Sequence, residues 1–230
     1  MRRFLLALAV VSAGAQAEWQ PTAELGFVNT TGNSEASTFN TKIAVKGEFD
    51  KWTHEAHALA VRGEANGETN AERYELAGSS HYALSDRRYL AGTGRYERDD
   101  FSPFEYQATA AVSYGWFAIK SERQNLLLEL GPGVRVAERV SGESDTNLIG
   151  RGLVDYSIDI SETAKFYNIF LTEAGKDNTF IQNDTGIAVK INASFALKAG
   201  YQIRRNSETP VGTENVDTLT TVNLVWTPGS

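Results

Sequence analysis

Apolar and polar residues alternate along one segment after another of this 230-residue chain, and no other feature limits its fold as strongly. Between residues 39 and 50, Phe39, Ile43 and Val45 share one parity, while Lys42 and Lys46 share the other. Successive side chains of a strand point to opposite sides of the sheet. The segment is therefore predicted to be a strand with one apolar face and one polar face.

The same pattern recurs to the end of the chain, in residues 74–82, 106–116, 126–136, 187–191, 195–204 and 218–226. Counting such segments from Thr22 to Trp226 gives about twelve strands of roughly ten residues, the length that a tilted strand needs to cross a membrane. No run of 18 apolar residues follows the first 17 positions, which excludes a helical membrane protein. The sequence predicts an all-β fold: a closed, antiparallel transmembrane β-barrel of about 12 strands.

The predicted connections differ in length from one end of the barrel to the other. The short ones are expected at 50–51, 84–86, 120–125, 159–163 and 192–193, and the longer polar ones at 30–34, 65–70, 99–105, 139–147, 175–184 and 206–215. Short periplasmic turns and longer extracellular loops are typical of an outer-membrane barrel. A soluble, lipocalin-like barrel would also alternate, but soluble strands are usually only about 5–6 residues long.

Aromatic residues near the predicted strand ends support the membrane interpretation, because amphipathic rings favour the headgroup level of a bilayer. Those on the short-turn side are Trp52, Tyr82, Tyr89, Trp116, Phe117, Phe166, Tyr167, Phe195 and Trp226. Each of them alone fits the core of a soluble barrel equally well.

The N-terminus predicts export. Arg2 and Arg3 precede an unbroken apolar stretch from Phe4 to Val11, and Ala15-Gln16-Ala17 is a small-x-small cleavage pattern. We therefore expect residues 1–17 to be a signal peptide and residues 18–230 to form a single outer-membrane β-barrel domain in a Gram-negative cell envelope. The apolar stretch is too short to anchor the chain as a membrane-spanning helix.

Charge and cysteine content exclude several classes of function. The chain has 22 basic and 29 acidic residues, so removing Arg2 and Arg3 with the signal changes the formal charge from -7 to -9 (20 − 29). An acidic chain of this kind is not expected to bind nucleic acid. Because the chain contains no cysteine, thiolate metal sites and disulfides are both impossible.

Several short segments resemble one known family. These are 23–27 (AELGF) followed by 31–34 (TGNS), 82–89 (YALSDRRY), 96–101 (YERDDF), and Asp217 before the last strand. They are similar to the salt-induced outer membrane protein family, and the match spans nearly the whole mature chain. The resemblance implies an outer-membrane β-barrel whose biochemical activity is not established. Two departures are Gln20-Pro21, where the family tends to have glycine, and the four residues that follow Trp226, beyond the aromatic end recognised by the barrel-assembly machinery.

The histidines do not predict a catalytic or metal site. His54 and His57 are three residues apart, which places them on opposite faces of a strand, so they cannot share a metal ion without a bulge. His81 with Ser79 or Ser80 provides parts of a hydrolase, but no nucleophile-elbow signature accompanies them. We predict no catalytic residue, no metal and no cofactor.

A charged cluster is the one candidate site, where the fifth predicted strand meets its loop. It comprises Arg95, Glu97, Arg98, Asp99 and Asp100. The cluster fits a charged pore constriction or a cation site. It also fits a salt-bridged lumen lining without any role in selectivity, which we favour because charges inside a barrel must be paired or solvated in any case.

Further charges are predicted for the lumen and the loops. The candidate lumen charges are Lys42, Lys46, Glu48, Arg62, Arg73, Glu75, Glu129, Arg135, Arg151, Asp155, Lys190, Lys198 and Arg204. The acidic loop residues, which could hold divalent cations beside lipopolysaccharide, are Glu64, Glu68, Glu72, Glu143, Asp145, Asp177, Asp184, Glu208 and Glu214.

Three functions remain open. The first is a narrow pore for small ions or solutes, or a structural barrel, linked to osmotic or salt conditions, which the resemblance favours. The second is a lipid-acting hydrolase of the outer membrane, and the third is a surface protein that binds partners through its loops. For all three functions we expect contact with outer-membrane lipids and lipopolysaccharide.

Overall fold

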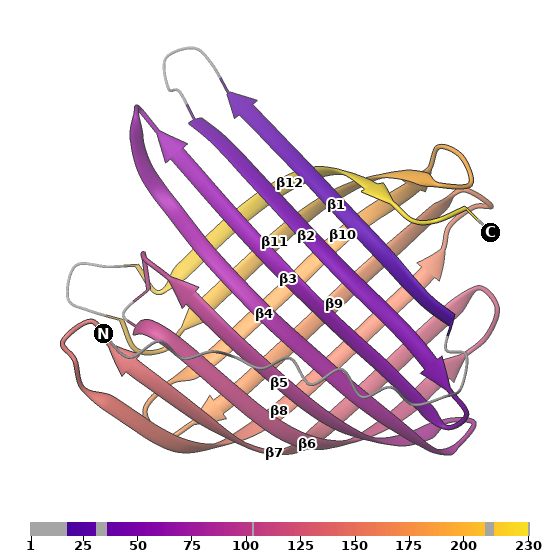
Figure 1. The fold of residues 1–230 in the computed structure, drawn as a ribbon, viewed down its shortest axis with the longest axis horizontal. Helices are drawn as coiled ribbons and strands as arrows, with labels where there is room; N and C mark the ends of the chain where they lie inside the picture. The colour runs from indigo at the N-terminus through magenta and orange to yellow at the C-terminus, as the bar shows by residue number, and fades with distance from the viewer. Residues whose placement is uncertain (1–17, 31–35, 103, 210–213, 230) are drawn as a thin grey trace.

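Twelve antiparallel strands close into a single barrel, as the alternation predicted (Figure 1). The computed structural model describes residues 18–30, 36–102, 104–209 and 214–229, so the predicted signal peptide lies outside the described residues. The strands are β1 (Glu18–Thr30), β2 (Ala36–Phe49), β3 (Trp52–Ala65), β4 (Glu68–Ser85), β5 (Arg88–Asp99), β6 (Phe104–Lys120), β7 (Gln124–Arg139), β8 (Ser144–Asp159), β9 (Ala164–Gly175), β10 (Thr179–Lys190), β11 (Phe195–Asn206) and β12 (Val216–Trp226). Within these ranges, no helix is long and apolar enough to span a bilayer.

The strands are longer than predicted, from 11 residues in β12 to 18 in β4. Two predicted loops are therefore largely strand. Residues 65–70 contain only a two-residue turn at Asn66 and Gly67, both with positive φ, which is the hairpin geometry that an Asn-Gly pair favours. Residues 179–184 belong to β10, and the polar Gln182 and Asp184 face the lumen instead of belonging to a loop.

The connections confirm the predicted asymmetry only in part. At one end of the barrel they span two to four residues, beginning with 50–51 and ending with 191–194. At the other end they range from the two residues at 66–67 to the nine at 207–215. We call these the short-turn end and the loop end.

An apolar belt covers the outside of the barrel. Its exposed side chains include Leu25, Phe39, Ile43, Leu76, Leu90, Val112, Leu130, Leu148, Ile187, Leu197, Val222 and Leu224. Of the predicted aromatic residues, Trp52, Trp116, Phe195 and Trp226 are exposed on this outer surface, whereas Tyr89, Phe117 and Tyr167 line the interior.

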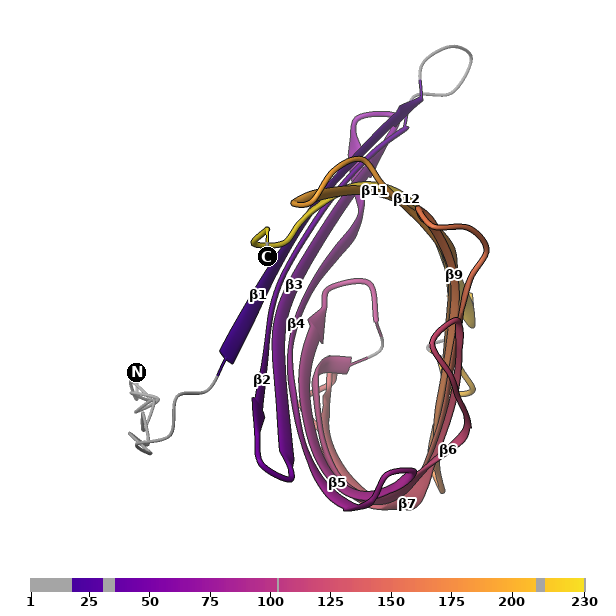
Figure 2. The same ribbon diagram turned by 90° about the vertical axis from the view of Figure 1, so that its right-hand side faces the viewer.

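The barrel is elongated in cross-section rather than round, and its wall turns sharply near β5 to β7 (Figure 2). Gly131 and Gly133 belong to β7, one of the strands at this turn. A Cβ atom on Gly131 would overlap the backbone carbonyl of Val112, so only glycine permits this approach of β7 to β6. Between them, Pro132 has no amide hydrogen to donate, and the β6–β7 pairing is interrupted at this point.

The seam between β1 and β12 closes the barrel with only four paired residues on each strand, from Ala23 opposite Trp226 to Gly26 opposite Asn223. By comparison, β1 pairs with β2 over 13 residues, and β11 pairs with β12 over 11. The loop-end half of the seam is thus not hydrogen-bonded in the described part of the chain, and β1 and β2 project past the ring of the other strands (Figure 2).

Candidate functional site

Ion pairs cross the lumen from one long side of the barrel to the other. Arg204 of β11 donates from Nη2 to both carboxylate oxygens of Glu97 on β5, each at 2.6 Å. Its Nη1 donates to Oδ2 of Asp99 at 3.1 Å. Hydrogen bonds between charged groups are roughly twice as strong as those between neutral groups.

A second set of pairs continues the same layer. Arg95 of β5 donates from Nη2 to Oε2 of Glu173 on β9 at 2.7 Å, and from Nη1 to Glu97 at 3.3 Å. Arg135 of β7 approaches the same Glu173 carboxylate at 3.3 Å and donates to the backbone carbonyl of Asn178 at 2.9 Å. Glu173 therefore holds two arginines from different strands.

Phe180 of β10 lies at the centre of these pairs and is only 1% exposed. The guanidinium carbons of Arg95 and Arg204 lie 4.6 and 5.1 Å from its ring centroid, within the range of cation–π attraction. A further link across the lumen is made by Arg73 of β4, which donates to the Gln202 side chain of β11 at 2.9 Å. We call Arg73, Glu75, Arg95, Glu97, Asp99, Arg135, Glu173, Phe180 and Arg204 the constriction network.

The constriction network is balanced in charge and largely buried. It holds four arginines and four carboxylates, counting Glu75, whose carboxylate lies 3.9 Å from Arg95. The side chains of Glu97, Arg135, Glu173 and Arg204 are each no more than 5% exposed. These four side chains are therefore almost completely shielded from solvent.

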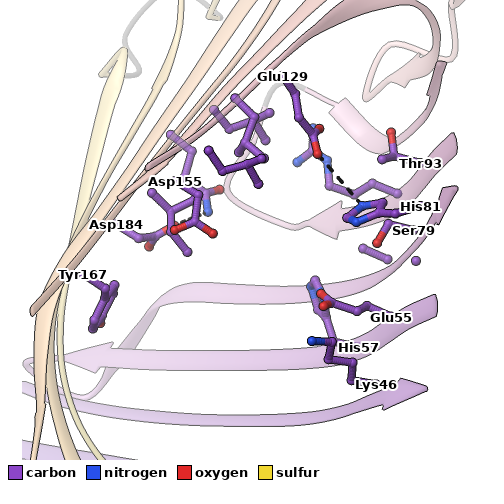
Figure 3. A pocket seen from close by; sticks show the side chains of 18 of the residues that line it. Lys46, Glu55, His57, Ser79, His81, Thr93, Glu129, Asp155, Tyr167 and Asp184 are labelled. Carbon is purple, nitrogen blue, oxygen red and sulfur yellow. Dashed lines mark hydrogen bonds and ion pairs between the residues drawn. The ribbon is translucent and has the colours of Figure 1, made fainter. Parts of the chain in front are cut away.

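Towards the short-turn end, the lumen widens into a cavity of about 1050 Å³ (Figure 3). Its lining runs from turn residues such as Lys51 and Asp86 to Arg95 and Glu173 of the constriction network. We call this cavity the chamber. One part of its wall, on β7 to β9, is apolar and carries Leu127, Leu153, Ile169 and Leu171. A porin lumen is usually polar throughout, so this wall sets the chamber apart.

Glu129 organises the charged side of the chamber (Figure 3). Its carboxylate accepts hydrogen bonds from the Tyr89 hydroxyl at 2.6 Å and from Arg151 at 2.5 Å. His81 Nε2 lies 3.9 Å from the same carboxylate, and its ring stacks on Tyr89. Since Arg151 and the tyrosine hydroxyl satisfy Glu129, it is held as a structural anchor and is not free to act as a base.

The histidines do not assemble a catalytic triad among the described residues. Ser79 and His81 both line the chamber, but no hydrogen bond joins them. His54 Nδ1 instead lies 2.8 Å from the Ser80 hydroxyl on the opposite, outward face, and His57 is bound to Glu75 at 2.8 Å inside. His54 and His57 therefore do lie on opposite faces, as their spacing predicted. No group of three or more His, Asp or Glu in the described ranges is placed to hold a metal ion.

The predicted charge cluster divides between the two faces of β5. Arg95, Glu97 and Asp99 point into the lumen and join the constriction network. Arg98 and Asp100 pair with each other at 3.0 Å on the outside, where Arg98 is 53% exposed. Arg62, predicted for the lumen, also lies outside and pairs with Glu64, whereas Asp184, predicted for a loop, lines the chamber.

Two central residues, Glu173 and Phe180, were not among the predicted site residues. Glu173 had a detectable signal, because it is the acidic residue that follows the apolar segment Phe166–Leu171 in a strand, and such a residue is expected to face a polar interior. Phe180 had none, since an aromatic residue in a barrel strand usually faces lipid.

Comparison with known proteins places the chain among β-barrels. The model of a family described as "Protein of unknown function, DUF481" matches residues 23–227. The uncharacterized protein YdiY of Escherichia coli K12 is 26% identical over 215 residues, which cover 92% of this chain and 84% of YdiY.

Two solved structures share the fold. The NanC porin aligns with a TM-score of 0.53 and 10% identity, over 90% of this chain and 97% of the porin chain. The translocator domain of the autotransporter NalP from Neisseria meningitidis aligns with a TM-score of 0.50 and 12% identity, over 91% and 86% of the two chains. At these identities the likeness establishes the barrel fold alone.

Proposed function

This chain belongs to the DUF481 family, whose function is unknown, and we propose that it is a narrow, gated pore of the bacterial outer membrane. In its resting state the constriction network closes the lumen. The observation that carries the proposal is that the ion pairs of this network join β5 to β9 and β11 across the lumen, are balanced in charge and are buried.

The outward surface supports a place in the membrane. Apolar side chains on it would contact the hydrocarbon layer, and Trp52, Trp116, Phe195 and Trp226 would lie at the headgroup level near the short-turn end. In this arrangement residues 1–17 direct export, the barrel-assembly machinery inserts the barrel, and the loop end faces lipopolysaccharide. The barrel fold that this chain shares with the NanC porin agrees with a pore.

A closure built from ion pairs suits a response to salt. The pairs are screened little while they are buried, but water and ions that enter the layer would weaken them and keep the separated charges solvated. Opening therefore exchanges pairs between side chains for contacts with small ions. This links the pore to osmotic or salt conditions, and small ions or solutes are its cargo.

The test is single-channel conductance of the purified protein in planar bilayers over a range of salt. The double variant Arg95→Ala/Glu173→Ala removes one cation and one anion, so three arginines and three carboxylates remain in balance. We expect the unchanged protein to stay closed for most of the recording and the double variant to show frequent, larger conductance steps.

The matched control is Arg98→Ala/Asp100→Ala, which removes an ion pair of the same types from the outer face of the same strand. It should behave like the unchanged protein. A folded Arg95→Ala/Glu173→Ala barrel that remains silent would contradict the pore. Equal conductance in all three proteins would contradict closure by the network.

A further inference from the structure

The short β1–β12 seam leaves a gap in the barrel wall. The register of the four pairs, if continued towards the loop end, would bring Phe27 opposite Val222 and Val28 opposite Thr221. Neither pair forms, although β1 remains paired with β2 and β12 with β11 at these residues. The backbone groups that face the gap on both strands are thus without strand partners there.

The gap lies within the apolar belt. Phe27 and Val222 are exposed on either side of it by 62% and 43%. On β11, which pairs with β12, the apolar surface continues towards the loop end. Ala199 pairs with Val222 there, and the exposed Ile203 pairs with Thr218. Unpaired backbone at membrane depth is tolerated only where it lines a cavity or is covered.

The inner side of the gap belongs to the chamber. Leu219, Thr221 and Asn223 of β12 line the chamber, as do Glu24 of β1 and Asn40 of β2. The chamber therefore reaches the seam itself. A molecule in the gap would contact the membrane on one side and the chamber on the other.

Two buried amides at the closed end of the gap each have one polar atom without a partner. Asn40 and Asn223 are 3% and 5% exposed, yet Nδ2 of Asn40 and Oδ1 of Asn223 make no hydrogen bond. Both lie over Gly26, where a Cβ atom would collide with them. Buried polar groups nearly always have a partner, so these two point to a polar ligand group.

Charges of both signs stand beside these amides. Lys198 Nζ lies 3.0 and 3.1 Å from the Glu24 carboxylate, which also accepts from Asn223 Nδ2 at 3.2 Å. An ammonium could be held by Glu24, and a phosphate by Lys198. The apolar Leu59 and Leu219 line the same chamber.

We propose that the β1–β12 gap is a lateral opening for a membrane phospholipid, with its headgroup at Glu24, Lys198, Asn40 and Asn223 and an acyl chain in the gap. Such a phospholipid would come from the leaflet at the short-turn end. Its headgroup site lies at the paired end of the seam, and the gap for its acyl chain extends from there towards the loop end. The inference rests on the proposed membrane location but not on conduction.

The experiment places the full chain in vesicles of phosphatidylethanolamine and phosphatidylglycerol. A small fraction of the phosphatidylethanolamine carries a photoreactive diazirine on an acyl chain. After illumination, adducts are mapped by proteolysis and mass spectrometry. We expect adducts on outward residues such as Leu76 and Leu197 and, in addition, on the chamber-facing Leu219 and Leu59.

The route is tested with Val28→Trp, which places a bulky ring on the lumen side of the gap because Val28 alternates with the outward Phe27 and shares the inward face of Glu24. The control is Ile187→Trp, which enlarges an outward residue of β10 away from the seam. Val28→Trp should remove the adducts on Leu219 and Leu59 and keep those outside, whereas Ile187→Trp should keep both. Chamber adducts that persist in Val28→Trp would overturn the lateral route.

The control adducts separate the two proposals. Outward adducts without chamber adducts in the unchanged protein would overturn the lipid site and leave the membrane location intact. An absence of outward adducts would overturn the membrane location itself.

Discussion

Replacing Glu97 by alanine is expected to lower the free energy of unfolding by about 3–5 kcal/mol, the usual cost of removing one partner from a buried ion pair. Glu97 is the bidentate acceptor for Arg204 and also accepts from Arg95. Without it, two buried guanidinium groups each lose one of their two hydrogen-bonded carboxylate partners, and Arg204 keeps only the longer contact with Asp99. The measurement is urea unfolding of the barrel in lipid vesicles, followed by tryptophan fluorescence.

Two variants make this prediction specific. Arg98→Ala breaks an exposed pair on the same strand and should cost no more than about 1 kcal/mol. The double variant Glu97→Met/Arg204→Met replaces both charges with apolar groups, and we expect it to regain most of the loss. If Glu97→Ala were no more harmful than Arg98→Ala, the pair would be solvated and the lumen would not be closed at this level.

Gly131→Ala is expected to be the most damaging small substitution outside the charges. Its Cβ would overlap the carbonyl oxygen of Val112 and the Cα of Ser113, which are backbone atoms that cannot rotate away. The strands would have to separate, and overpacking of this kind costs about 1–3 kcal/mol or more. The same urea unfolding measures it, together with the yield of folded barrel.

Gly92→Ala is its matched control, because nothing lies within 4 Å of a Cβ at that position. It should change the free energy of unfolding by no more than about 0.5 kcal/mol, as surface substitutions usually do. Equal stability of the two variants would mean that β6 and β7 do not approach each other as closely as the corner requires.

The strands and their faces could be predicted because the alternation is a local property of the chain. The period of two gave the number of strands, and it separates Arg95, Glu97 and Asp99 from Arg98 and Asp100 once one face is known to be the lumen. The prediction of loops was less accurate where lumen-facing polar residues of a strand, such as Gln182 and Asp184 of β10, resembled a loop.

The partners across the lumen could not be predicted, because they depend on the closure of the whole barrel. Arg204 meets Glu97 from a position 107 residues away, and Glu173 meets Arg95 from 78 residues away. Which strands face each other, and at what height, follows from the stagger accumulated around all twelve strands and from the shape of the cross-section. The short β1–β12 seam is likewise a product of closure.

The glycine corner between β6 and β7 has a consequence for how such a pore could be tuned. A rounder ring of twelve strands would move β5 away from β9 and β11, beyond the reach of a single arginine side chain. Gly131 and Gly133 permit the close approach of β7 to β6 beside the sharp turn of the wall, and Arg95 and Arg204 meet their carboxylates across the flattened lumen. In the proposed pore, uncharged backbone positions would therefore set the bore, and a change there would alter ion flow with every charge still in place.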